Sequence, residues 1–508
     1  MSARRTTVLA LLAAAALLSG SGLTGCRLGP KYTPPVAPAI TAPNYKESTV
    51  NFQDMDGWKV AKPQDAMIRC KWWEIFNEPE LNALEEQVEV NNQNIKQSYE
   101  NFMAARTQVA QARAQYWPTV TTSPSWQRSR TSQNLANSSN QESSGRTSSE
   151  WSFPLSVAWE PDFWGKIRNQ VREAQYGAQV SAADLESERL SVQSSLAQYY
   201  FEIRGQDALE SILNDTVKAD EKSLELAQTR YDSGVDDRIS VVEAKTALES
   251  AKSAAINVGV ARAQYEHAIA TLIGKPATDF SIPVKPLLRQ APAIPVGVPS
   301  QLVERRPDVA SAERTLAEAN ATIGIGYGAF FPSVSLAADG GFNSSTLKHA
   351  FDWPSRFWSV GPSVSQTIFN GGLYQAELHQ YTATYNADLA TYRQTVLTAF
   401  QQVENYLAAV RLYSQQIARQ QEAVANAQES LDLETGRYES GVDPYLDVVT
   451  AQTTLLSGQQ TLATLQVQEM TASVQLIAAL GGGWDVSQLP SPKDVSQKPA
   501  KRDYSLQR

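Results

Sequence analysis

The feature that most constrains this chain is a long internal repeat. Arg230–Asp236 reads RYDSGVD and Arg437–Asp443 reads RYESGVD, so the motif recurs 207 residues later. The same offset places Arg204 on Arg411. A fixed long period means that a chain is built from copies of one structural unit. We therefore expect two structurally equivalent halves.

The repeat sets the expected domain organisation. The first structural repeat is assigned to residues 64–292 and the second to 293–483, each with helices and a strand pair. A signal peptide would occupy residues 1–25, a lipidated linker 26–63 and a C-terminal tail 484–508. The linker is rich in Pro and Thr without a sustained period, which favours an extended tether.

The N-terminus resembles the leader of a bacterial lipoprotein. Arg4 and Arg5 precede a short apolar run and the tetrapeptide LTGC, which is similar to a lipobox. In a lipobox the cysteine is acylated and becomes the N-terminus, so we expect Cys26 to be lipidated; a plain exported protein is the alternative. In bacterial lipoproteins an aspartate after the lipidated cysteine often signals retention in the inner membrane. Arg27 stands at that position here, which favours the outer membrane. Cys70 then has no intramolecular partner and is expected to be a small buried hydrophobe.

Composition argues against nucleic-acid binding and against catalysis. The formal net charge is −9, from 44 basic and 53 acidic side chains that are interspersed. The three histidines, His267, His349 and His379, show no metal-binding spacing, and no phosphate-binding loop is present. A glycine-rich stretch at 324–329 follows a helical pattern, the reverse of a dinucleotide-binding order, and is assigned to close helix packing. We expect no enzyme activity, no cofactor and no metal.

Two very long helical runs are expected, one in each half. Between Gly372 and Gly441 there is no proline, and apolar residues recur every three or four positions. A run of about 65 residues would extend roughly 100 Å, too long to wrap a compact core and suited to a coiled coil or a helical tube. Helices over 240–272 and 447–480 return after turns in which Gly234 and Gly441 supply positive φ.

Each half also contains a predicted strand pair, over 119–133 and 149–159 and over 333–342 and 357–369. Aromatic residues concentrate at the strand ends, as in the girdles of membrane barrels, although the edge of a soluble sandwich also fits. After the leader no run of 18 apolar residues occurs, so a membrane crossing would need a closed β-barrel. Four strands cannot close a barrel alone, which implies oligomerisation.

Several segments together resemble the outer membrane factor family, the TolC-like and OprM/NodT-type lipoprotein channels of tripartite efflux pumps. They are LVERRPDVASAE at 302–313, FFPSVSL at 330–336, IFNGG at 368–372 and RYESGVDPYLDVVTAQ at 437–452. The resemblance implies an α+β membrane protein. Four strands from each protomer of a homotrimer would form a 12-stranded outer-membrane β-barrel, which a long α-helical barrel would continue across the periplasm.

The implied function is passive export of drugs or other small toxic compounds. The implied partners are a periplasmic adaptor (membrane fusion) protein, an inner-membrane transporter of the RND type, and outer-membrane lipid. The alternatives are an exit duct for type I protein secretion, or a structural lipoprotein that spans the envelope without a pore.

The resemblance also places a periplasmic gate and an adaptor-docking surface at the helical tips. Acidic rings narrow the entrance in the family, which points to Asp447. At the next inward turn Thr450 replaces an aspartate of the family, and Glu243 occupies the equivalent place in the first half. Helix N-terminal charge complementation explains Asp447 equally well. The residues expected to latch the helical tips together are Arg230, Tyr231, Arg437 and Tyr438. The residues expected to dock the adaptor are Gly234, Val235, Gly441 and Val442. Ordinary helix-end packing remains the alternative for the latch.

Overall fold

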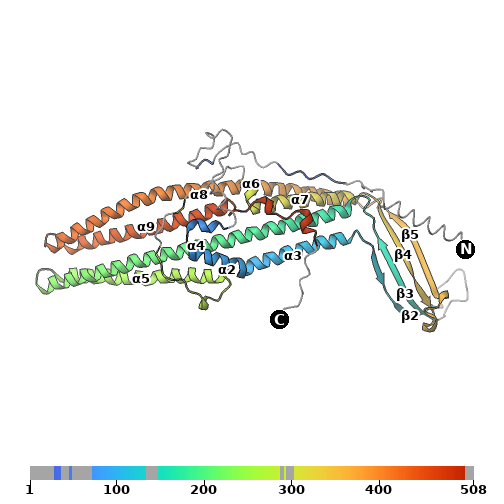
Figure 1. Ribbon diagram of the computed structural model, residues 1–508, viewed down its shortest axis with the longest axis horizontal. Helices are drawn as coiled ribbons and strands as arrows, with labels where there is room; N and C mark the ends of the chain where they lie inside the picture. The colour runs from blue at the N-terminus through green and yellow to red at the C-terminus, as the bar shows by residue number, and fades with distance from the viewer. Residues whose placement is uncertain are drawn as a thin grey trace.

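A computed structural model describes most of the chain, namely residues 28–35, 45–47, 71–132, 147–286, 291–292, 294 and 302–497. Cys26, Cys70 and most of the expected leader and linker lie outside these residues. The molecule is elongated, with a β-sheet at one end and the tips of two helical hairpins at the other (Figure 1).

Two pairs of helices, equal in length, form the elongated body. The long helices α4 (Lys166–Asp232) and α8 (Leu373–Glu439) have 67 residues each. The returning helices α5 (Arg238–Leu272) and α9 (Tyr445–Ala479) have 35 each. Every start follows its counterpart by 207 residues, the offset of the sequence motif. The predicted long helices and their partners are confirmed, and Pro444 is the N-cap of α9.

Shorter helices complete the body between its middle and the sheet (Figure 1). The helices before the first strand are α2 (Pro79–Asn91) and α3 (Gln93–Ala114), and those of the second half are α6 (Leu302–Arg305) and α7 (Pro307–Gly328). Helix α3 packs on α4, and α7 packs on both α4 and α8. The short remaining elements are η3 (Trp72–Phe76), η4 (Ala277–Asp279), η6 (Leu347–His349), η7 (Trp353–Ser355), η8 (Val486–Gln488) and α10 (Pro492–Val495).

The glycines of α7 allow helices to approach closely, as expected for this stretch. A Cβ on Gly324 would lie 2.5 Å from the Asn169 side chain of α4, and one on Gly326 would lie 2.8 Å from the Tyr381 ring of α8. Glycine thus permits an approach that any larger residue would prevent.

The strands form one antiparallel sheet in the order β1/β2, β3, β4, β5. Their bounds are Thr119–Thr122, Ser125–Arg130, Thr147–Trp159, Ser333–Ser344 and Arg356–Ser365. Strands β1 and β2 pair with successive parts of β3, so they are one strand position interrupted at Ser123 and Pro124. The predicted strand at 119–133 is divided there because proline lacks the N–H that a ladder needs.

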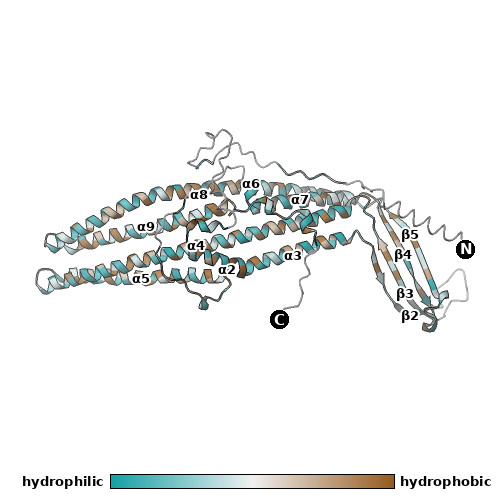
Figure 2. Cartoon of the chain, in the orientation of Figure 1, coloured by the Kyte–Doolittle hydropathy of each residue, from teal (hydrophilic) through white to brown (hydrophobic). Residues whose placement is uncertain are grey.

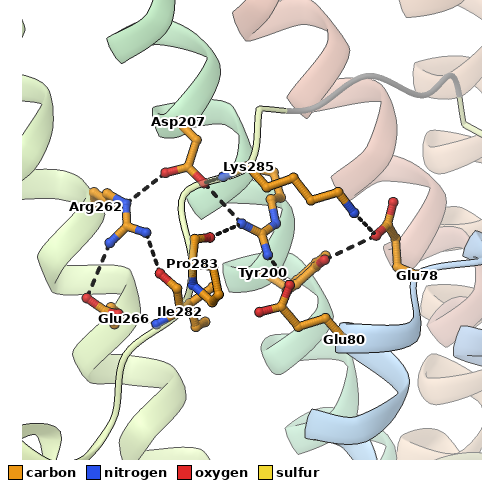
Figure 3. Close-up of polar contacts among 10 residues, drawn as sticks. Glu78, Glu80, Tyr200, Asp207, Arg262, Glu266, Ile282, Pro283 and Lys285 are labelled. Atoms are coloured by element: carbon orange, nitrogen blue, oxygen red, sulfur yellow. Dashed lines mark hydrogen bonds and ion pairs between the residues drawn. The ribbon is translucent and has the colours of Figure 1, made fainter.

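A buried polar cluster holds the segment after α5 against the helices (Figure 3). The Asp207 carboxylate of α4 accepts bonds from Arg262 Nε of α5 at 2.7 Å, from Arg204 at 3.0 Å and from the Lys285 amide at 2.8 Å. Arg204 also donates to the Pro283 carbonyl at 2.7 Å and pairs with Glu80 of α2. Since the Asp207 side chain is 0% exposed, its charge is balanced only by these partners.

The second half binds a different segment at the equivalent place. Arg411, the counterpart of Arg204, pairs with Glu47. Glu404 of α8 accepts bonds from the amides of Lys46 at 2.8 Å and Glu47 at 3.0 Å, and Tyr45 is buried among apolar side chains of α8. The N-terminal residues 45–47 therefore occupy on α8 the place that residues 282–285 occupy on α4.

One buried carboxyl has no such partner. Glu85 of α2 is 0% exposed, and neither of its oxygens accepts a hydrogen bond in the described part of the chain. Burial raises the pKa of Glu85 well above its usual value, and the nearby Glu89 adds to the effect.

Asp207→Asn should destabilise the helical body by about 3–5 kcal/mol, because the substitution leaves the buried Arg204 and the partly buried Arg262 without their shared counter-charge. Guanidinium unfolding of the detergent-solubilised protein, followed by circular dichroism, measures the change. Asp215→Asn is the control, since its pair with Lys218 is about 70% exposed and is worth at most about 1 kcal/mol. Equal stabilities of the two variants would contradict the assigned role of Asp207.

Candidate functional site

The sheet has one apolar face and one polar face. Residues paired across antiparallel strands share a face, and Leu155, Gly340 and Trp358 are paired in one row. The same face also presents Val120, Trp126, Trp151, Phe153, Val157, Trp159, Leu336, Phe342, Val360 and Val364. The apolar face is open to the surroundings of a single chain, with Trp358 75% and Val360 63% exposed. An exposed apolar surface of this kind marks a membrane or partner contact.

The opposite face of the sheet is polar in its central rows. Ser156, Asp339 and Ser359 form one row across three strands, and Ser152 and Asn343 form another, in which the serine donates a 2.7 Å hydrogen bond. The alternation of the two faces follows from the period of two in a strand.

Hydrophobic and hydrophilic residues are interspersed along the long helices (Figure 2). None of the helices in the described ranges combines the length and apolar character that a membrane span requires.

The N-terminal segment begins where the sheet meets the helices. The Leu28 amide donates to the Trp164 carbonyl at 3.4 Å, and Asn169 of α4 donates to the Leu28 carbonyl at 3.1 Å. Further along, Asn320 of α7 donates to the Pro30 carbonyl at 3.2 Å. Residue 28 is therefore fixed at the junction, two positions after the expected lipidation site.

The two hairpin tips have the same backbone geometry. Gly234 has φ +74° and Gly441 has φ +75°, so the predicted positive φ is confirmed at both turns. The Val235 amide donates to the Arg230 carbonyl at 3.0 Å, and its counterpart at residue 442 makes the same bond. Val235 and Val442 are 67% and 65% exposed, so each tip presents an apolar side chain outward.

The tips touch through a polar contact between the halves. The Tyr438 hydroxyl at the end of α8 donates to Asp236 of the first turn at 2.7 Å. The Arg230 guanidinium lies over the Tyr438 ring, 4.6 Å from its centre, and donates to the Glu439 carbonyl at 3.0 Å. Arg230 also lies 3.7 Å from the Asp236 carboxylate. The structure thus brings together two of the four expected latch residues, Arg230 and Tyr438.

The contact shifts the ionisation of both partners. Burial raises the pKa of Tyr438, and donation to Asp236 raises it further. Partial burial would raise the pKa of Asp236, but its hydrogen bonds from Tyr438, the Asp237 amide and Ser240, together with the charge of Arg230, lower it overall. The carboxylate form of Asp236 is therefore favoured at the tip.

The other two expected latch residues lie elsewhere. Arg437 pairs with Asp443 of its own turn, which raises the pKa of the guanidinium and lowers that of the Asp443 carboxyl. Tyr231 is 41% exposed. Within a single chain, these residues do not join the contact between the halves.

The acidic residues expected at the gate are not all together. Asp447 lies in the first turn of α9, where it is exposed. Its carboxylate lies within 4.8 Å of those of Glu434 and Asp443. Glu243 is half-buried on α5. The position of Asp447 fits both a helix N-terminal charge and an entrance residue.

The site-residue predictions omitted the acceptor of the latch, Asp236. Its signal in the sequence was its recurrence as Asp443, six residues after an arginine in both copies of the motif. The omission arose because the Tyr438–Asp236 bond joins residues 202 positions apart, and the motif alone does not reveal the pairing.

Comparisons with known proteins agree with these features. Residues 84–275 and 298–482 match the family model described as outer membrane efflux protein. The chain is 32% identical over 468 residues to the toluene efflux pump outer membrane protein TtgC of a Pseudomonas putida strain, covering 91% of this chain and 93% of the relative. Identity and coverage are the same for the antibiotic efflux pump outer membrane protein ArpC of Pseudomonas putida.

The fold also matches solved structures. The outer-membrane channel OprN superposes with a TM-score of 0.80 at 26% identity, covering 90% of this chain and 100% of that one.

Tyr438→Phe should loosen the tips while keeping the ring in place. Loss of one hydrogen bond to a carboxylate should speed amide exchange at residues 230–236 by about tenfold. Hydrogen–deuterium exchange with mass spectrometry measures this rate. Tyr374→Phe, which loses a hydroxyl bond to Thr367 near the sheet, is the matched control. Unchanged exchange at the first turn in Tyr438→Phe would show that the hydroxyl does not hold the tips together.

Proposed function

This chain belongs to the outer membrane efflux protein family, and we propose that three copies form the outer-membrane channel of a tripartite pump. The chain is the outer-membrane component of an efflux pump, and the members of its family are conduits rather than enzymes. The proposed cargo is a drug or another small toxic compound. Of two relatives at equal identity, one is named for toluene and the other for antibiotics. We therefore assign to this chain the conduction of the exported compound, and to an inner-membrane transporter the selection of that compound.

The apolar face of the sheet supports a membrane barrel. In a single chain, β1/β2 and β5 are edge strands with unpaired backbone groups. Such edges pair with further strands or are otherwise protected. Three copies with four strand positions each would pair every edge in a 12-stranded barrel, with the apolar face toward lipid and the polar face toward water. The long helices would continue the duct by about 100 Å.

The place of Leu28 supports a lipid anchor at Cys26. Two residues extend at most about 7 Å. Since Leu28 is fixed where the sheet meets the helices, an acyl group on Cys26 would lie beside the end of the barrel that adjoins the helices. Anchor and barrel would then enter the membrane at one level, and the described residues 30 and 45–47 lie against α7 and α8.

The tips at the opposite end are the proposed gate and docking surface. Val235 and Val442 present apolar side chains at the far ends of the hairpins, where a periplasmic adaptor would contact them. The Arg230–Tyr438–Asp236 contact would hold the entrance narrow. Asp447 from three copies would add an acidic ring that favours cations.

Val360→Arg should prevent insertion of the channel, since the substitution places a charge on the apolar face in each of three copies. Near the bilayer midplane such a charge costs about 2–4 kcal/mol. Ser359→Arg, one residue away on the polar face, is the matched control and should still insert. Conductance of the purified protein in planar bilayers measures both. A Val360→Arg channel that inserts as well as Ser359→Arg would overturn the assignment of the two faces.

Cys26→Ser should abolish acylation while leaving the folded body intact. Cells that express the wild-type chain should incorporate radiolabelled palmitate into it, and Cys26→Ser should incorporate none. Cys70→Ser is the control and should remain labelled. Absence of label from the wild type would remove the proposed anchor.

A further inference from the structure

The end of the sheet farthest from the helices (Figure 1), which we call the rim, carries arginines on its apolar face. Trp126 of β2 belongs to that face, and Arg128 and Arg130 follow it by two and four positions in the same strand. Because side chains alternate along a strand, all three are on one face. Strand β5 contributes Arg356, its first residue, which is paired with the apolar-face residue Phe342. All three arginines are exposed.

The rim arginines have no acidic partner within the described ranges. Glu150, the nearby acid of β3, belongs to the polar face of the sheet. Asp352, the acid of the loop between β4 and β5, is paired with His349, whose Nδ1 lies 2.6 Å from its carboxylate. Lys348 of the same loop is exposed and adds a further cation. The described part of the rim therefore presents positive charge that it does not neutralise itself.

The opposite end of the sheet is arranged differently. Arg168, at the start of α4, lies 3.0 Å from the Asp162 carboxylate, which also accepts bonds from the backbone amides of residues 167 and 168. A cation at the helix end of the sheet is thus balanced within the chain. The contrast marks the rim as the end that meets a negative partner from outside.

The loop between β4 and β5 folds onto the apolar face and positions Arg356. The Phe351 ring lies 4.8 Å from the Phe153 ring and 5.8 Å from the Phe342 ring, measured between centres. The Arg356 guanidinium lies over the Trp353 ring, 3.7 Å from its centre. A guanidinium over an aromatic face keeps the N–H donors at its edge available, and a phosphate can accept two of them in parallel. Trp353 is 73% exposed, so the pair faces the surroundings.

The apolar face below the rim has the height of a membrane. Along β5, eight positions separate Val364 near the helices from Arg356 at the rim. At about 3.4 Å per residue this is about 27 Å along the strand. At the tilt of a barrel strand it is roughly 20 Å along the membrane normal, comparable to the apolar band of about 25 Å in outer-membrane barrels. Arg356 therefore lies at headgroup level when the apolar face lies in lipid.

The position of the helices identifies the leaflet that the rim meets. In the proposed channel the helices extend into the periplasm, so the rim is on the outer side of the membrane. The outer leaflet of an outer membrane consists of a phosphorylated glycolipid. Its phosphates match the rim arginines both in charge and in the planar, paired geometry that a guanidinium prefers.

We propose that the rim binds phosphate groups of the outer-leaflet glycolipid, with Arg356 on the Trp353 ring as the central contact. Lys348 adds charge from the same loop. In the proposed barrel, edge strand β5 of one copy lies beside the edge position β1/β2 of the next, so Arg128 and Arg130 of a neighbouring copy face the same lipid layer. This inference rests on the proposed membrane barrel, and it names the lipid that the barrel binds on its outer side.

Binding of lipid A to the detergent-solubilised full-length protein, followed by native mass spectrometry, tests the proposal. Lipid A from which the phosphates have been removed is the matched probe, and the wild type should bind it about tenfold more weakly. Arg356→Gln should weaken binding of intact lipid A by about tenfold, since charge-assisted hydrogen bonds are lost, and should leave binding of the stripped lipid unchanged. Arg419→Gln, at an arginine of α8 that is 83% exposed, is the control and should bind as the wild type does.

Two further variants separate charge from geometry. Arg356→Lys keeps the charge and loses the planar fork, so its affinity for lipid A should fall between those of the wild type and Arg356→Gln. Trp353→Leu keeps the arginine and removes the ring beneath it, which should weaken binding by about threefold because the guanidinium loses its fixed orientation.

The inference is overturned by equal affinity of the wild type for the two lipids, or by equal affinity of the wild type and Arg356→Gln for lipid A. Displacement of lipid A by an equimolar amount of inorganic phosphate would also overturn it, because the rim would then bind a free anion rather than a lipid. Conductance in planar bilayers reports the proposed function separately. A conducting channel with any of these results leaves the channel proposal standing, whereas a wild-type protein that does not conduct overturns the channel proposal whatever lipid it binds.

Discussion

The structure depends on covering the apolar side chains of two very long helices. A single helix of 67 residues cannot bury these side chains by itself, so other elements must pack against it. Helix α4 packs against α3, α5, α7 and α9. Helix α8 is covered by α7 and α9. Helix α7 is shared by both, and its glycines let the two long helices approach on either side of it. The orientation of α4 relative to α8 sets where the sheet begins and where the tips meet.

Much of this architecture could be predicted from local patterns. The run without proline between Gly372 and Gly441 predicts α8 almost to the residue, because helix propensity and period act over short distances. The division of the first strand could have been read at Pro124. The pairing of Asp207 with Arg262, of Arg411 with Glu47 and of Tyr438 with Asp236 could not, since each joins residues that the chain pattern does not relate.

The two repeats differ in sequence at the helix positions that a non-helical segment covers. Arg204 and Arg411 are equivalent, yet Asp207 and Arg262 correspond to Ser414 and Glu469. The first half buries an ion pair under residues 282–285, whereas the second pairs Arg411 with Glu47 of the N-terminal segment. Each half is therefore closed by a segment from outside its own helices. The second is closed by residues that also lead back toward the expected lipid anchor.

The lone carboxyl of Glu85 couples folding of the body to proton uptake. Its pKa is raised in the folded chain, so the group is neutral there at a pH where the unfolded chain would ionise it. Above the ordinary glutamate pKa, folding must therefore bind a proton, and stability falls by about 1.4 kcal/mol for each pH unit until the folded pKa is passed. Asp236 acts oppositely, because its lowered pKa makes the tip contact weaken only in acid. Acidification would thus first strengthen the middle of the molecule and, only in stronger acid, release the tips, so one solvent variable acts on the middle and on the tips with opposite signs.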